Sequence, residues 1–139
     1  LGAENSIDAL DRLPGVLAAH KPTHIILMHG TNDIPPFCPE CPNDITRGYM
    51  EAMAKLAKEA GAEVIMGEFT LKAYGGEIAQ AYTAAYQNAA ANSKSTYVNL
   101  VNGIPYDANN YEFDGIHFTD AAQEAIKNNV AGALFQMLR

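Results

Sequence analysis

Lys and Arg are scarce in this chain, and long hydrophobic runs are absent. Nine Lys and Arg residues stand against sixteen Asp and Glu residues in 139, which gives a formal net charge of -7. Without a basic cluster, nucleic acid or an anionic membrane surface is not expected as the main partner. No apolar run approaches the ~20 residues that a membrane-spanning helix needs. Hydrophobic residues still make up 48% of the chain, so we expect one globular domain over residues 1–139.

Cysteine is rare as well, with two residues in the chain. Cys38 and Cys41 form a single CxxC between prolines. A structural zinc site usually takes four ligands, and a thioredoxin-type pair opens a helix directly after a strand. A local disulfide, free thiols, and metal or redox work all stay open, and a disulfide would favour a periplasmic or secreted protein. Otherwise the sequence leaves the localisation unknown, and it implies no metal and no cofactor.

The start of the chain lacks the features of a signal peptide. Residues 1–5 contain neither a basic start nor an apolar stretch, and residue 1 is Leu rather than an initiator Met. We therefore expect that sequence ahead of residue 1 was removed or left out, which bears on which parts of the fold the chain contains.

Three short apolar runs predict buried strands. They are rich in β-branched residues and are continuous rather than alternating, which is typical of strands covered on both faces. The predicted strands are residues 23–29, 63–68 and 96–100.

Amphipathic segments at helical spacing lie before, between and after these runs. Asn5 or Ser6 is expected to cap a first helix, which Pro14 interrupts and which ends near residue 20. The other predicted helices cover residues 44–60, closed by Gly61, then about 78–89, and finally 119–137. Strands joined by helical crossovers indicate an α/β fold with three α/β/α layers and a parallel sheet.

Two motifs carry the chemistry. The motif DGIH at 114–117 places a carboxylate three residues before an imidazole, so that Asp114 can fix the tautomer of His117 and stabilise its protonated form. The motif GTND at 30–33 follows the first predicted strand, where the Asn32 amide is suited to donate to an oxyanion. Ligand sites of parallel α/β sheets lie beyond the carboxyl ends of the strands. We therefore expect both motifs to converge on one edge of the sheet.

Structural interpretations of the same residues compete with the catalytic ones. Asp114 can be a helix-start carboxylate beside an ordinary histidine, and Asn32 can be a turn residue. Asp33 is expected to order its loop through side-chain-to-backbone hydrogen bonds rather than to react. His29, at the end of a predicted strand, is expected to be packed, with a site-lining role as the alternative. Because the two motifs occur together, we favour catalytic roles for Asp114, His117 and Asn32.

Together the motifs resemble the SGNH, or GDSL-like, hydrolase family of serine esterases and lipases. GTND is similar to the family's third block, whose Asn donates to the oxyanion, and DGIH is similar to its fifth block, which supplies the acid and the base. Gly2 is the best match to the second block, where a glycine N–H also faces the oxyanion. The resemblance implies a flavodoxin-like SGNH hydrolase fold and a serine-type ester hydrolase, such as an esterase, lipase or lysophospholipase-like acyl hydrolase, acting on a small-molecule ester.

The chain departs from the family at its first block, a Gly-Asp-Ser that follows the first strand. Ser6 is expected to be a helix cap, and Ser93 and Ser95 fall in a polar turn at the other end of the sheet. We therefore expect the nucleophilic serine upstream of this chain, and the N-terminal strand or strands of the fold to be missing with it.

The missing strand has a structural consequence. In the family it lies beside the strand that corresponds to residues 24–29, which without it becomes an open apolar edge. We expect an upstream segment or a partner chain to cover this edge, with a rearranged or swapped fold as the remaining possibility. The alternative function is a catalytically incomplete SGNH-like domain that binds a ligand or a protein.

Overall fold

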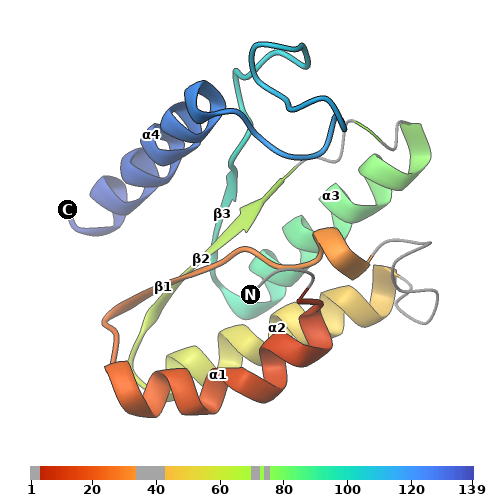
Figure 1. The fold of residues 1–139 in the computed structure, drawn as a ribbon. Helices are drawn as coiled ribbons and strands as arrows, with labels where there is room; N and C mark the ends of the chain where they lie inside the picture. Colours follow the sequence, from red (N-terminus) through yellow and green to blue (C-terminus); the bar gives the residue numbers. More distant parts are fainter. Residues whose placement is uncertain (1–3, 34–42, 70–72, 74–75) are drawn as a thin grey trace.

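The structure is a computed structural model that describes residues 4–33, 43–69, 73 and 76–139, with the side chains of residues 43 and 44 excepted. Its helices and strands alternate along the chain (Figure 1). They are α1 (Ser6–His20), β1 (His24–Leu27), the 3-10 helix η1 (Thr31–Asp33), α2 (Asn43–Glu59), β2 (Glu63–Glu68), α3 (Gly76–Ser93), β3 (Thr96–Asn99) and α4 (Asp120–Met137).

The three strands form one parallel sheet in the order β1-β2-β3. The register pairs Ile25 with Val64, and Ile65 with Thr96. Figure 1 shows α1, α2 and α3 on one side of this sheet and α4 on the other. The α/β fold with a parallel sheet between helical layers, predicted from the sequence, is confirmed.

Each face of the sheet has its own hydrophobic core. The larger core joins α1, α2, α3, β1 and β2, with Leu13, Met53 and Met66 among its buried side chains. The smaller core lies between α4 and the segment after β3, around Val101 and Ala122. Burying a side chain of this size contributes roughly 1.5–3 kcal/mol, so these two cores hold the carboxyl ends of the strands in place.

The first helix differs from its prediction in two respects. α1 runs without a break through Pro14, since Pro14 lies on the exposed face while Leu13 and Leu17 on the inner face stay buried. A proline costs one backbone hydrogen bond there, and the apolar face of the helix offsets that loss. Asn5 is the N-cap and accepts from the Asp8 N–H at 2.9 Å, whereas Ser6 is the first helical residue and is fully buried. The expected capping role of Ser6 is therefore wrong.

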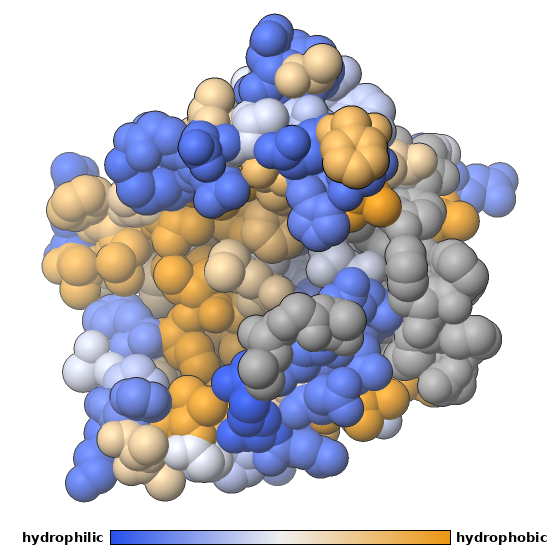
Figure 2. Space-filling view, in the orientation of Figure 1, coloured by the Kyte–Doolittle hydropathy of each residue, from blue (hydrophilic) through white to orange (hydrophobic). Residues whose placement is uncertain are grey.

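β1 is an edge strand within the described part of the chain, and its outer side is apolar. Ile26 and Met28 are 36% and 44% exposed. They line a groove of about 680 Å³ together with Phe69, Phe118 and the α4 residues Ile126, Val130 and Leu134. Figure 2 shows hydrophobic side chains, in orange, gathered in this groove below a largely hydrophilic surface, in blue. The open apolar edge at residues 24–29 is as predicted.

Candidate active site

The Asp114–His117 pair lies at the tip of a hairpin between β3 and α4. An antiparallel bridge joins Tyr111 to Phe118, and the Glu112 N–H donates to the His117 carbonyl at 2.8 Å. At the tip, the Gly115 N–H donates to the Glu112 carbonyl at 2.8 Å, and Gly115 has a φ of 70°, which favours glycine. The hairpin thus turns Asp114 and His117 toward each other.

The two side chains form a close pair. Nδ1 of His117 lies 2.6 Å from Oδ2 of Asp114. The other carboxylate oxygen accepts from the backbone N–H of Ile116 at 2.8 Å and from that of His117 at 3.0 Å. These contacts leave Nε2 as the ring nitrogen that points away from the acid. The sequence prediction that the carboxylate can orient the imidazole is therefore met by the geometry.

The same contacts set the charge of Asp114. The hydrogen bond with His117, followed by the two backbone N–H donors, lowers the pKa of Asp114 from 3.8 to about 2. Asp114 is therefore an anion at neutral pH. The side chain of His117 is 78% exposed in the described structure, so the imidazole is open to a reacting group.

A capping role for Asp114 is excluded by the start of the last helix. Thr119 is the N-cap of α4, and its side chain accepts from the Ala122 N–H. Asp114 instead bonds within its own hairpin. The structure thus assigns the helix cap and the Asp-His pair to different residues.

Asn32 lies on η1, directly beyond the carboxyl end of β1. Its Nδ2 donates to the Glu4 carbonyl at 3.0 Å. A carboxamide nitrogen carries two N–H groups, so this bond uses one of them. Gly30 allows the chain to turn here with a φ of 106°, and an added Cβ would lie 2.9 Å from the Tyr86 hydroxyl oxygen. The strand-to-η1 turn is therefore closely packed against α3.

Asp33 makes a side-chain-to-backbone hydrogen bond, as the sequence suggested, but its partner is on α1 rather than in its own loop. It is fully buried, and its Oδ1 accepts from the Ser6 N–H at 2.8 Å. Its carbonyl accepts from the Tyr82 hydroxyl. A carboxylate at the first turn of α1 is favoured by the helix dipole. Asp33 thus links η1 to α1 and α3, and these contacts fix the backbone next to Asn32.

Both motifs open onto the same edge of the sheet. Asn32 lines a polar hollow of about 320 Å³ that also includes Ile26 and Met28. His117 lines the apolar groove of about 680 Å³, and Ile26 and Met28 line that groove as well. The two hollows therefore share Ile26 and Met28 as lining residues, and a common catalytic cleft stays a prediction. Gly2, the predicted second donor, lies outside the described residues, as do Cys38 and Cys41.

A Glu4–Arg12 ion pair that the sequence analysis missed lies beside Asn32, together with His29. Arg12 forms two hydrogen bonds of 2.7 Å with the carboxylate of Glu4, and Nδ1 of His29 lies 3.8 Å from that carboxylate. Burial, the largest cause, lowers the pKa of His29, while Glu4 opposes the shift. All three line the hollow with Asn32. His29 is half-buried and lines this hollow, which is the site-lining alternative that the sequence analysis gave. Helical spacing could not predict the Glu4–Arg12 pair, because Glu4 precedes α1.

None of the described serines lines the groove with His117. Ser6 is fully buried at the start of α1. Oγ of Ser93 donates to the Ala89 carbonyl at 2.6 Å and lies 2.8 Å from Oγ of Ser95, at the end of α3 that leads into β3. That end is the amino edge of the sheet, opposite the site. All three serines lie within the described part of the chain.

Among the described residues no cluster of His, Cys, Asp and Glu could hold a metal ion. The described helices also include none with the length and apolar character needed to cross a membrane.

Known proteins resemble this chain over almost its whole length. The sequence model of the GDSL-like lipase/acylhydrolase family matches residues 1–125. Esterase TesA of Pseudomonas aeruginosa is 29% identical over 140 residues, which cover 99% of this chain and 68% of the esterase. A crystal structure of TesA matches with a TM-score of 0.85 at 28% identity, over 94% of this chain and 72% of that one. The psychrotrophic esterase EstA of Pseudoalteromonas sp. matches with a TM-score of 0.81 over 98% of this chain and 74% of EstA, and at 20% identity it supports the fold alone.

Proposed function

The chain belongs to the GDSL-like lipase/acylhydrolase family and is a hydrolase that acts on esters, and on this basis we propose a catalytic role for each of its site residues. His117 is the general base, Asp114 orients and stabilises it, and Asn32 donates to the oxyanion. The nucleophile is a serine in sequence that precedes this chain, and the substrate is a small-molecule ester. The observation that carries this proposal is the 2.6 Å Asp114–His117 pair, which opens onto the same sheet edge as Asn32.

The proposed reaction proceeds in two steps. Nε2 of His117 takes the proton from the serine hydroxyl while its oxygen bonds to the ester carbonyl carbon. The tetrahedral intermediate then collapses, the C–O bond to the alcohol breaks, and the imidazolium returns its proton to the leaving alcohol. Water repeats the sequence on the acyl-enzyme and releases the acid. The anionic Asp114 stabilises the imidazolium in both steps.

The oxyanion would be held by three donors. They are the Asn32 amide, the backbone N–H of Gly2, and the N–H of the serine itself. Removing one such donor typically lowers the rate by about 10²–10³. The hydrogen bond from Asn32 to the Glu4 carbonyl supports this role, because it ties the amide to the segment that follows Gly2.

Two observations support a nucleophile outside this chain, and the family resemblance implies that it lies in an upstream segment that also covers β1. The three serines of the chain have their own structural positions. The matched proteins are longer than this chain, which spans 68% of esterase TesA and 72% of the TesA structure. An added strand beside β1 would bring a serine at its carboxyl end close to both Asn32 and His117, because parallel strands end at one edge.

The proposal is tested in the complete protein with p-nitrophenyl acetate and butyrate. His117→Ala should lower kcat about 10⁴–10⁶-fold. His20→Ala is the matched control, because His20 is exposed at the far end of α1. A fluorophosphonate probe should label a serine ahead of residue 1, and mass spectrometry identifies that serine.

Two outcomes would contradict the assignment. Undiminished turnover in His117→Ala would remove His117 as the base. A complete protein that neither turns over esters nor reacts with the probe would favour the alternative of a catalytically incomplete domain that binds a ligand or a protein.

A further inference from the structure

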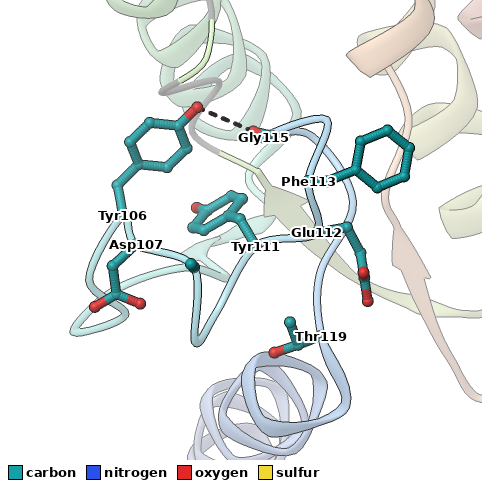
Figure 3. Close-up of a pocket in the computed structure, with 8 residues that line it drawn as sticks. Tyr106, Asp107, Tyr111, Glu112, Phe113, Gly115 and Thr119 are labelled. Carbon is teal, nitrogen blue, oxygen red and sulfur yellow. Dashed lines mark hydrogen bonds between the residues drawn. The ribbon is translucent and has the colours of Figure 1, made fainter.

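We propose that Tyr106 is a positioning residue for the Asp114–His117 pair, acting through the peptide group between Gly115 and Ile116. The inference rests on the proposed catalytic role of that pair. Tyr106 lies in the segment that leads from β3 to the hairpin, nine residues before Gly115. Its hydroxyl donates to the Gly115 carbonyl at 3.2 Å, as Figure 3 shows.

The bonded carbonyl belongs to a peptide group that serves the catalytic acid. The C=O of Gly115 and the N–H of Ile116 are the two ends of one planar unit. The N–H end donates to Oδ1 of Asp114 at 2.8 Å, and Oδ2 of the same carboxylate lies 2.6 Å from His117. A continuous chain of hydrogen bonds therefore runs from the Tyr106 hydroxyl to the imidazole. Donation to the carbonyl also polarises the amide and strengthens its N–H as a donor.

The rest of Tyr106 is held by aromatic packing. Its ring meets Tyr111 edge-on at 4.6 Å between centroids, and Tyr111 meets Phe118 at 5.0 Å. Figure 3 shows Tyr106 and Tyr111 beside each other, with Phe113 on the other side of the pocket. That pocket measures about 510 Å³. The hydroxyl thus reaches the hairpin tip from a half-exposed ring that packs edge-on against Tyr111.

The position of Gly115 is matched to this contact. A Cβ at Gly115 would lie 2.6 Å from the Tyr106 hydroxyl oxygen, and the φ of 70° also favours glycine. The absence of a side chain at residue 115 therefore allows the hairpin tip to approach the Tyr106 hydroxyl closely.

The test is Tyr106→Phe in the complete protein, because Phe keeps the ring and removes only the hydroxyl. We expect kcat for p-nitrophenyl butyrate to fall about three- to tenfold with KM little changed, the size expected for one hydrogen bond. The pKa of the Asp114 carboxyl, followed by ¹³C NMR, should rise from about 2, but by less than in His117→Ala, which removes the largest cause of the shift. Tyr97→Phe is the control. It also removes a bonded hydroxyl, one that donates to the buried Glu68 at 2.6 Å, and it should lower stability without changing either readout.

The outcomes separate this inference from the proposed function. If Tyr106→Phe keeps the parental kcat and the titration of Asp114 near 2, while His117→Ala is inactive, Tyr106 has no positioning role and the proposed mechanism stands. If His117→Ala is fully active, the mechanism fails, and with it the positioning role of Tyr106 for catalysis.

Discussion

At the scale of single residues, the pair that the sequence analysis favoured, Asp114 and His117, is in direct contact. Asp114 and His117 are three residues apart, so a short hairpin is enough to bring them together. Asn32 is different: its amide donates to a carbonyl 28 residues away, and no spacing rule predicts that partner. Local chemistry is therefore predictable from local sequence, whereas the partners of Asn32 depend on the fold.

The charge of Asp114 gives a prediction at this scale. Its pKa is lowered to about 2, so its contribution to stability is fully present above pH 3.8 and is lost as the pH falls through about 2. In His117→Ala the largest cause of the shift is gone, while the backbone donors remain. The Asp114 carboxyl should then titrate between about 2 and 3.8, as measured by ¹³C NMR. A titration that stayed near 2 would show that His117 does not stabilise the carboxylate.

A second residue-scale prediction concerns the turn that carries Asn32. Gly30→Ala places a Cβ 2.9 Å from the Tyr86 hydroxyl oxygen at a φ of 106°. We expect a loss of about 1–3 kcal/mol in the free energy of unfolding, measured by urea denaturation. An unchanged unfolding midpoint would show that the turn is less closely packed than described.

At the scale of helices and strands, periodic patterns predicted most of the structure. The strands at 63–68 and 96–99 and the last three helices fall within a few residues of their expected positions. The exception is α1, where Pro14 was expected to interrupt the helix. The local preference of proline was overridden because α1 buries Leu13 and Leu17 on either side of it.

Gly15 provides the test at this scale. It lies inside α1 next to Pro14, and a Cβ there would meet no atom within 4 Å. Gly15→Ala should therefore raise the free energy of unfolding by about 0.5–1 kcal/mol, because alanine loses less conformational entropy in a helix. The same urea denaturation measures it. A loss of stability would indicate that α1 is distorted at Pro14, as the sequence first suggested.

At the scale of the whole molecule, the main feature is the apolar surface that β1 leaves exposed. Ile26 on β1 and Met28 just beyond its end are partly exposed beside the candidate site. A face of this kind is an aggregation hazard unless another segment covers it. We expect the strand that brings the serine to be that segment, which would make the apolar groove part of the core.

The effect of Ile26→Thr on the complete protein tests that expectation. If an added strand covers the groove, the substitution should cost about 1–3 kcal/mol of unfolding free energy. Phe113→Ser is the control, because Phe113 is fully exposed, at 102%; it should change stability by less than about 0.5 kcal/mol. Equal, small effects of both substitutions in urea denaturation would show that the groove stays open.

The sequence by itself determined the α/β class, most of the element boundaries and the Asp114–His117 couple, because each depends on interactions between residues close in the chain. Only the tertiary structure decided which residues far apart in the chain are in contact. It joined Asp33 to Ser6, Asn32 to Glu4 and Tyr106 to Gly115. The first two contacts depend on how α1 and η1 pack at the carboxyl edge of the sheet, and the third depends on an aromatic cluster. Neither kind of packing has a periodic signature along the chain, so neither could be read from spacing.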